Sequence, residues 1–367
     1  MANDGERTHR RMNLGSKEFI PPRPIANPRG KLLIAACRSG TELATKIADR
    51  YQELSIAAGG EEDVLRLMNL DRTFPDGETC ARLERHVGGR DAFLVCSPLD
   101  LRSPRTVDQN VMALLISART LKEAGVSHLT LIVTYLPYSR QDKASKWARE
   151  PNTAALFAEL AMTAGLDRLV CWHPHSFTLR GLYGKLPVHM LEGLTFALEE
   201  LRELEGREGT ILLGPDAGSV KTSTHLANIL GLPVGLASKS RVGPDEVIVN
   251  QFVGDFNGKH RAVIVDDILS SCGTVHAVAK KLVEEFSIRE IRIVASHLVC
   301  LPDGRRRLLD LQKNYFLKKV VVTNTIPVTK EFEELPFLKI RCLSDPLARV
   351  VNRIHQHESL SEVFYRP

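Results

Sequence analysis

The sequence predicts an α/β protein made of two consecutive units, each a mainly parallel sheet with helices on both faces. Short apolar runs alternate with longer segments of helical period from residue 31 to residue 356. The apolar runs contain few polar residues, which is typical of parallel strands that are covered on both faces. The chain has 367 residues, enough for about two domains of ordinary size.

The first unit alternates strands and helices. Its predicted strands are residues 31–37, 92–97, 129–135 and 168–173. The helices predicted between them are residues 41–54, 107–125 and 153–165. Leu43, Ile47 and Tyr51 fall on one face of the first helix, as expected of a helix that packs on a sheet.

The second unit repeats this alternation. Its predicted strands are residues 210–215, 233–238, 246–256, 262–268, 291–299, 319–326 and 338–343. Its predicted helices are residues 191–206, 219–231, 274–286 and 346–356. We expect the two units to join near residues 180–190, which gives domains of residues 30–185 and 186–367.

The charge of the chain is unevenly distributed. The net charge is +5, and residues 1–29 contribute six basic and three acidic residues to it. This proline-rich segment is predicted to be a disordered basic arm. The nearly neutral remainder argues against a protein specialised for nucleic acid, so no specific nucleic-acid partner is expected.

Cysteine usage and hydropathy indicate the compartment. The seven cysteines are scattered and form no CxxC pair, which suits a reducing environment and excludes a zinc ribbon. No apolar run reaches the roughly 18 residues of a membrane span, and the N-terminal segment lacks a hydrophobic stretch. We therefore expect a cytoplasmic protein without a membrane partner.

The strongest local motif is residues 262–282. A buried strand carries Asp266 and Asp267, and a short loop, residues 270–274, then opens a helix. Free amide groups at a helix start bind anions, and carboxylates can accept hydrogen bonds from sugar hydroxyls, so the segment suits a ribose phosphate. An acidic pair in an ordinary strand-to-helix turn with a serine cap explains the segment equally well.

Five further segments place polar residues after strands or in a turn. They are the charged loop with Arg140 and Gln141, the turn with Phe74, Asp76 and Glu78, the end of a strand at His173, the segment with Asp216, and the pair Lys239 and Arg241. Each has an ordinary structural explanation when taken alone. The glycine spacing around Asp216 excludes a Walker phosphate loop, and no dinucleotide-binding glycine motif is present.

Taken in order, these six segments resemble the ribose-phosphate pyrophosphokinase family over residues 31–365. The resemblance implies two stacked phosphoribosyltransferase-like domains, with ATP on the N-terminal side and ribose 5-phosphate on the C-terminal side. It implies transfer of the diphosphoryl group of ATP, with Mg²⁺, to the C1 hydroxyl of ribose 5-phosphate. It also implies a homo-oligomer that is built from dimers and is usually a hexamer.

The resemblance also implies a role for each candidate residue. The residues implied to bind ATP are Phe74, Asp76, Glu78, Arg140, Gln141 and His173. Among them, Phe74, Asp76 and Glu78 are implied to reach the ATP bound by a neighbouring subunit. The implied Mg²⁺ ligands are His173 and Asp216, and the implied catalytic residues are Lys239 and Arg241. The residues implied to bind ribose 5-phosphate are Asp266, Asp267, Ser270, Ser271, Cys272, Gly273 and Thr274.

The loop that is expected to bind the phosphate departs from the family pattern, which usually reads Asp-Asp-x-x-Asp-Thr-Gly-Gly-Thr. Ser270 replaces the third acid, and Cys272 replaces a glycine. Cysteine adopts a positive φ less readily than glycine does. A second hypothesis is therefore a catalytically weak member that regulates or assembles with an active partner. A base-transferring phosphoribosyltransferase is disfavoured by the ATP-side motifs.

Overall fold

The computed structural model describes residues 29–60, 64–143, 149–216, 218–241 and 247–362. The predicted arm, residues 1–29, therefore lies outside the described residues except for its last member. Arg29 is buried, and it donates hydrogen bonds of 2.8 and 2.9 Å to the carboxylate of Asp91. The ordered domain thus includes at least one residue of the segment assigned to the arm.

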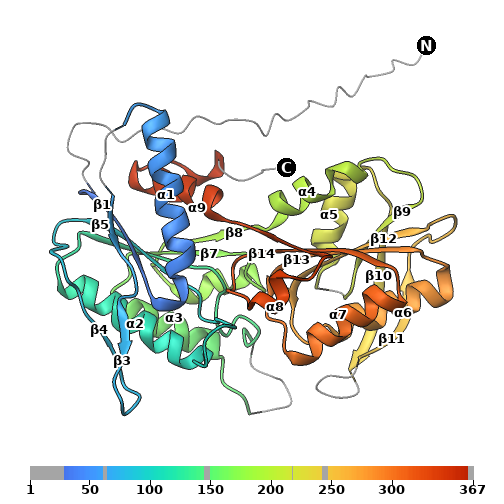
Figure 1. The fold of residues 1–367 in the computed structure, drawn as a ribbon, viewed down its shortest axis with the longest axis horizontal. Coiled ribbons are helices and arrows are strands. Elements are labelled where there is room, and N and C mark those ends of the chain that lie inside the picture. The colour runs from blue at the N-terminus through green and yellow to red at the C-terminus, as the bar shows by residue number, and fades with distance from the viewer. Residues whose placement is uncertain (1–28, 61–63, 144–148, 217, 242–246, 363–367) are drawn as a thin grey trace.

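Parallel strands form the first sheet (Figure 1). Their order is β2 (Leu65–Leu67), β1 (Leu32–Ala36), β5 (Asp91–Cys96), β6 (His128–Val133), β7 (Arg168–Trp172) and β8 (Val188–Leu191). The helices that connect the longer strands are α1 (Thr41–Ala57), α2 (Val107–Glu123) and α3 (Thr153–Thr163). Every residue of β1 and β5 is buried, which confirms the prediction of covered parallel strands.

The second sheet is larger and mainly parallel. Its order is β11 (Val247–Val253), β10 (Val234–Arg241), β9 (Thr210–Gly214), β12 (Arg261–Leu269), β13 (Glu290–Leu298), β14 (Leu317–Thr323) and β15 (Leu338–Arg341). Only the pairing of β11 with β10 is antiparallel among these described strands. The accompanying helices are α4 (Leu194–Leu201), α5 (Val220–Leu230), α6 (Gly273–Phe286), α7 (Pro302–Asn314), α8 (Lys330–Glu333) and α9 (Ser344–His355).

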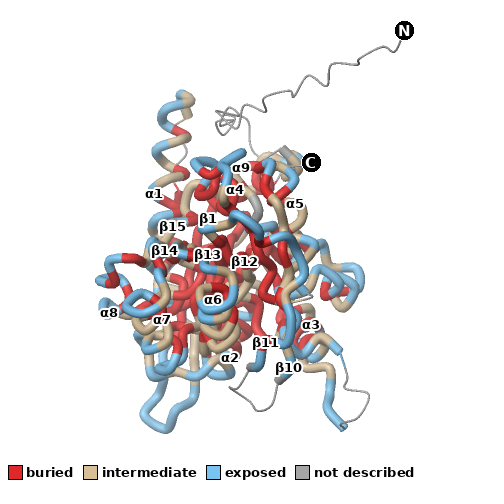
Figure 2. Tube along the Cα trace, turned by 90° about the vertical axis from the view of Figure 1, so that its right-hand side faces the viewer, coloured by how far each residue is buried: buried red, intermediate tan, exposed pale blue. Residues whose placement is uncertain are grey.

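The two domains share part of their hydrophobic core. One apolar cluster combines Trp172 of the first sheet with Leu212 and Val263 of the second and Leu347 of α9. Two further clusters lie on the other faces of the two sheets. Figure 1 shows α1, α9, α4 and α5 on one side of the sheets and α2, α3, α7 and α6 on the other. Figure 2 shows the buried strands enclosed by these helices.

The structure departs from the expected boundary at residues 185/186 in two places. β8 lies after that boundary, yet it pairs with β7 in the first sheet. α9 also returns to the first domain, where it packs against α1 and Asp345 pairs with Arg50 at 2.7 Å. Both segments come after the expected boundary in the chain, but their pairing and packing place them in the first domain.

Some elements have no counterpart among the predictions. β2 and β8 are three and four residues long and carry polar side chains, so neither forms a clear apolar run. α7 is dominated by charged residues and buries only Leu308, Leu311 and Gly304. No helix in the described part of the chain is both long enough and apolar enough to cross a membrane.

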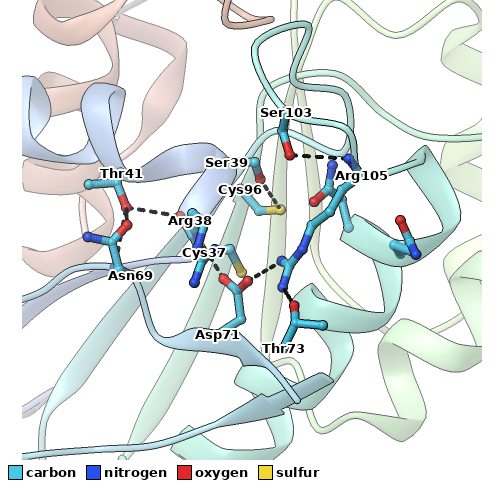
Figure 3. A network of polar contacts seen from close by, with 12 residues as sticks. Cys37, Arg38, Ser39, Thr41, Asn69, Asp71, Thr73, Cys96, Ser103 and Arg105 are labelled. Atoms are coloured by element: carbon cyan, nitrogen blue, oxygen red, sulfur yellow. Dashed lines mark hydrogen bonds and ion pairs between the residues drawn. The ribbon is translucent and has the colours of Figure 1, made fainter. Parts of the chain in front are cut away.

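The predicted turn around Phe74 joins two short antiparallel strands, β3 (Asp71–Thr73) and β4 (Thr79–Ala81). The base of this hairpin is fixed by Asp71, which is buried and accepts a hydrogen bond of 2.6 Å from the backbone amide of Arg38. Arg105 pairs with Asp71 and donates to Thr73 (Figure 3). The hairpin therefore projects from a fixed base, as Figure 1 shows.

Candidate functional site

Five of the predicted site residues lie toward the carboxyl ends of strands from both sheets. The residues in these positions are His173 after β7, Asp216 after β9, Lys239 in β10, and Asp266 and Asp267 in β12. In open α/β sheets, ligands bind in the crevice outside these strand ends. The two parallel sheets thus bring these residues to the edges at which a ligand is expected.

Lys239 connects two of the predicted segments. Its Nζ lies 2.9 Å from Oδ2 of Asp216 and donates a 3.2 Å hydrogen bond to Oγ1 of Thr274 in the first turn of α6. Burial alone would raise the pKa of Asp216, but the hydrogen bond and charge of Lys239 outweigh it, so this pKa is lowered. Asp216 and Lys239 therefore form an ion pair beside the predicted phosphate loop.

The adjacent acids of β12 have opposite pKa shifts. Burial raises the pKa of Asp266 well above its ordinary value, and the nearby charges of Asp267 and Asp216 add to this effect. Burial also acts to raise the pKa of Asp267, but the hydrogen bond with His175 outweighs it, so this pKa is lowered. The two acids therefore differ in their tendency to hold a proton, and together they offer oxygen atoms that can hydrogen-bond with sugar hydroxyls.

His175 is a neighbour of the acidic pair that the sequence analysis left out of the site. Its Nδ1 lies 2.5 Å from Oδ2 of Asp267, across the contact between the two domains. The hydrogen bond with Asp267 raises the pKa of His175 although burial opposes this. The sequence pointed to His175 only through its position two residues after His173. Its contact with Asp267, 92 residues away, could not be predicted from any local pattern.

His173 lies in the same contact between the domains. Its backbone φ is 37°, an unusual conformation for a residue other than glycine. Its Nδ1 is hydrogen-bonded to Oγ of Ser296, and its carbonyl oxygen accepts a 2.9 Å hydrogen bond from Nε2 of His297. Burial lowers the pKa of His173, which favours the neutral ring that could bind a metal or a phosphate oxygen.

The loop of residues 270–274 opens α6 as predicted. Cys272 is the residue before the helix, and its φ of 57° and ψ of 13° lie in the left-handed region. This region favours glycine, which the family pattern has at this position. Its buried thiol contacts Cys300, and this contact, together with burial, raises its pKa. Arg307 donates a 2.7 Å hydrogen bond to the carbonyl oxygen of Ser271, which holds the loop from α7.

Arg140 and Gln141 lie in the loop after β6. The side-chain oxygen of Gln141 accepts a 2.6 Å hydrogen bond from Thr153 at the start of α3. Arg140 is exposed, and its charge acts to lower the pKa values of Tyr135 and His175. The guanidinium of Arg140 is thus close enough to the site between the domains to influence its titration.

The hairpin residues are placed differently. Phe74, at 50% exposure, Asp76 and Glu78 lie at the exposed tip, and the contacts found among the described residues join none of them to the other predicted site residues. Arg241 is the last residue of β10 and pairs with Val247 through the backbone, while its side chain lies outside the described structure. Within the described part of a single chain, the hairpin residues therefore lie apart from the other predicted site residues.

The donor set can be compared with the needs of Mg²⁺. In the part of the chain that the structure describes, no group of three His, Cys, Asp or Glu side chains could hold a metal ion. Mg²⁺ prefers oxygen ligands and is often held by one or two carboxylates together with substrate phosphates. Asp216 is an ionised carboxylate beside the expected phosphate positions, so the residues fit an ion that arrives with a nucleotide.

A cavity of about 310 Å³ lies elsewhere between the domains. Its lining includes Ser39 and Lys46 near the start of α1, Thr134 after β6, and Asn324 and Thr325 after β14. None of the residues predicted for the site lines it. The site is therefore identified by its clustered polar residues and not by this cavity.

Two mainly parallel sheets with polar residues at their strand ends, and a loop that opens a helix beside an acidic pair, define a two-domain protein of the phosphoribosyltransferase type. Residues 32–165 match the family model of the N-terminal domain of ribose phosphate pyrophosphokinase. Residues 189–332 match the phosphoribosyl transferase domain. The chain belongs to the ribose-phosphate pyrophosphokinase family, as its relatives also demonstrate.

Similar proteins cover most of the chain. The ribose-phosphate pyrophosphokinase of Aquifex aeolicus is 33% identical over 302 residues, which are 82% of this chain and 92% of that protein. The Bacillus subtilis enzyme of the same name is 31% identical over 91% of this chain and 97% of its own length. The crystal structure of phosphoribosylpyrophosphate synthetase from Mycobacterium smegmatis matches with a TM-score of 0.75 and 27% identity, covering 89% of this chain and 99% of that one. These findings confirm the predicted family and fold.

Proposed function

We propose that this chain is an active ribose-phosphate diphosphokinase. It would transfer the diphosphoryl group of Mg-ATP to the C1 hydroxyl of ribose 5-phosphate, forming phosphoribosyl pyrophosphate for nucleotide biosynthesis and releasing AMP. The observation that carries this proposal is the position of Lys239, whose Nζ contacts both Asp216 and Thr274. One cation is thereby shared between the proposed ATP side and the proposed ribose phosphate side.

Ribose 5-phosphate would bind between β12 and the start of α6. Asp266 and Asp267 would hold the ring hydroxyls, since carboxyl oxygens hydrogen-bond readily with hydroxyl groups. The backbone amides of residues 270–274, with the hydroxyls of Ser270, Ser271 and Thr274, would hold the phosphate. Amides at a helix start favour an anion whatever their side chains are.

ATP would bind on the N-terminal side. His173, Arg140 and Gln141 would contact its phosphates and ribose, and Asp216 with His173 would hold the accompanying Mg²⁺. That ion would neutralise charge on the phosphate oxygens when bound. The exposed hairpin with Phe74, Asp76 and Glu78 would serve the ATP of a neighbouring subunit, which makes a dimer-based homo-oligomer, usually a hexamer, part of this proposal.

The chemistry depends mainly on positioning and charge. Transfer of a phosphoryl group passes through a loose transition state in which charge spreads over the phosphate oxygens and the leaving group. Lys239 and Arg241 would stabilise the charge that develops on the transferring phosphates and on AMP. Lys239 would first exchange its contact with Asp216 for the substrate, so its charge is held in place before the reaction.

The proposal is tested by AMP release from ATP in the presence of Mg²⁺ and ribose 5-phosphate. Lys239→Ala should lower kcat roughly 100-fold, because it removes a charge that is needed most in the transition state. Lys318→Ala is the matched control, since Lys318 is an exposed lysine of β14, and it should leave kcat unchanged. Folded wild-type protein that releases no AMP would overturn the proposal.

The second candidate function is a regulatory or assembly role within the same family. The left-handed backbone of Cys272 favours it, because a strained phosphate loop would bind ribose 5-phosphate poorly. Silent wild-type protein that changes the activity of an active relative on mixing would support this role. A cytoplasmic location, proposed from the scattered cysteines, applies to both functions.

A further inference from the structure

We propose that Ser296 and His297 are positioning residues that orient His173 and leave its Nε2 as the ring nitrogen available to Mg-ATP. Both belong to β13 of the second domain, whereas His173 follows β7 of the first. This inference rests on the proposed function, because it deepens the role of His173 in binding ATP. It makes the ATP side of the site dependent on contacts from the other domain.

The first contact fixes the ring. Oγ of Ser296 is hydrogen-bonded to Nδ1 of His173, and Ser296 is fully buried, so water does not compete for this bond. The bond occupies Nδ1 in either direction. When Nδ1 donates to Ser296, Nε2 keeps the lone pair that a metal ion needs, and when Nδ1 accepts, the Nε2–H group can donate to a phosphate oxygen. No hydrogen bond to Nε2 of His173 is found among the described residues. Partners of this kind orient a ligating imidazole by engaging its second nitrogen.

The second contact fixes the backbone. The φ of His173, 37°, is costly for a residue with a side chain and persists only where surrounding contacts enforce it. The amide of His173 donates a 2.7 Å hydrogen bond to the carbonyl oxygen of Leu191 in β8. The carbonyl oxygen of His173 accepts a 2.9 Å hydrogen bond from Nε2 of His297. Both polar groups of this unusual residue are therefore held.

His297 is itself fixed by neighbours from both domains. Its Nδ1 lies 2.9 Å from Oγ1 of Thr325, and its ring packs edge-on against Tyr135 with centroids 5.1 Å apart. The carbonyl oxygen of Thr325 accepts hydrogen bonds from Thr134 at 2.5 Å and Ser97 at 2.9 Å. These two residues follow β6 and β5 of the first sheet. The frame around His173 is thus a buried network that spans the two domains.

The test uses the full chain and a probe that does not depend on turnover. Binding of α,β-methylene ATP with Mg²⁺ is measured by calorimetry for wild type, Ser296→Ala and Ser296→Thr. Ser296→Ala removes one hydrogen bond and should weaken binding roughly three- to tenfold. Ser296→Thr keeps the hydroxyl and should restore most of the affinity. Equal affinities for wild type and Ser296→Ala would overturn the proposal.

A double-mutant cycle with His173→Ala separates positioning from a merely structural role. If Ser296 acts through His173, Ser296→Ala should cause no further loss of affinity when His173 is already alanine. An equal loss in both backgrounds would overturn the proposal, and thermal unfolding of each variant identifies a general loss of stability. Wild-type protein that releases no AMP, but still shows the coupling, would refute the proposed function alone. Wild-type protein that does not bind the analogue would refute the proposed role of His173 and this inference with it.

Discussion

His355 and Asp91 form a fully buried hydrogen bond that joins the last long helix to the first sheet. Nδ1 of His355 lies 2.8 Å from Oδ2 of Asp91, and neither side chain is accessible to solvent. Arg29 binds the same carboxylate at 2.8 Å. Because α9 follows the second sheet in the chain but packs on α1, this buried cluster attaches the C-terminal segment to the N-terminal domain.

The first prediction concerns the stability that this cluster provides. Asp91→Asn removes the buried negative charge that pairs with Arg29 and His355, and breaking a buried ion pair is costly. We expect the free energy of unfolding to fall by about 3 kcal/mol, measured by urea denaturation. The control is Asp345→Asn, which breaks a more exposed ion pair with Arg50, between α9 and α1. It should cost less than about 1 kcal/mol. Equal effects of the two variants would contradict the prediction.

The second prediction concerns the pH dependence of the same carboxylate. Burial alone would raise the pKa of Asp91, but the hydrogen bonds from His355 and Arg29 outweigh it, so the pKa lies below its ordinary value of 3.8. The unfolded chain therefore binds this proton more readily than the folded protein does. The stabilisation is present above pH 3.8 and is lost as the pH falls through the lowered pKa.

The predicted loss of this stabilisation at low pH can be measured directly. The difference in free energy of unfolding between wild type and Asp91→Asn should shrink as the pH falls below about pH 4. Urea denaturation of both proteins at each pH gives that difference. A difference that grows as the pH falls below about pH 4 would have the wrong sign and would reject the assigned ionisation of Asp91.

The third prediction concerns the exposed hairpin. If Glu78 serves the ATP of a neighbouring subunit, a Glu78→Ala chain and a Lys239→Ala chain are defective in different halves of one site. Mixing the two inactive proteins should restore activity on the order of one quarter of wild type, because half of the random dimers contain one intact site. AMP release after verified subunit exchange is the measurement.

A matched mixture tests the same arrangement. Glu78→Ala mixed with Asp76→Ala leaves every hairpin defective, so this mixture should not recover activity. Recovery in both mixtures, or in neither, would argue against a site that is shared between subunits. The single chain is compatible with sharing because the hairpin tip is exposed while its base is fixed by Asp71 and Arg105 (Figure 3).

Local patterns in the sequence were sufficient to predict most of the fold. The buried residues of β1 and β12 form continuous apolar runs, and the loop at residues 270–274 opens a helix as expected. The resemblance to the family indicated backbone strain at Cys272, since this residue replaces a glycine of the family loop, and the structure has a φ of 57° there. These features depend on residues close together in the chain.

Contacts between distant segments could not be predicted in the same way. His175 meets Asp267 across 92 residues, and His355 meets Asp91 across 264. Neither pair has a spacing or periodicity that identifies its partner. The expected domain boundary left β8 and α9 out of the first domain for the same reason. Their positions depend on strand pairing and packing with distant segments. Ser296 likewise lies within an apolar strand and showed no sign of contacting His173.

The fourth prediction concerns the phosphate loop, where two effects of one side chain oppose each other. A residue other than glycine in the left-handed region costs about 1–2 kcal/mol, so Cys272→Gly should relieve strain. The same change removes a buried thiol that packs against Cys300, which loses apolar burial of similar size. The free energy of unfolding should therefore stay within about 1 kcal/mol of wild type, as measured by urea denaturation.

Binding of ribose 5-phosphate should respond more than stability does, because the amides that hold the phosphate move with the backbone of Cys272. Restoring the family loop with Ser270→Asp, Ser271→Thr and Cys272→Gly should lower the KM for ribose 5-phosphate roughly three- to tenfold. The kcat should remain unchanged, since Lys239 is left in place. Cys300→Ala is the control, because it removes the neighbouring thiol without altering the loop, and its KM should equal that of wild type. A lower KM in Cys300→Ala as well would assign the effect to thiol packing rather than to the left-handed backbone.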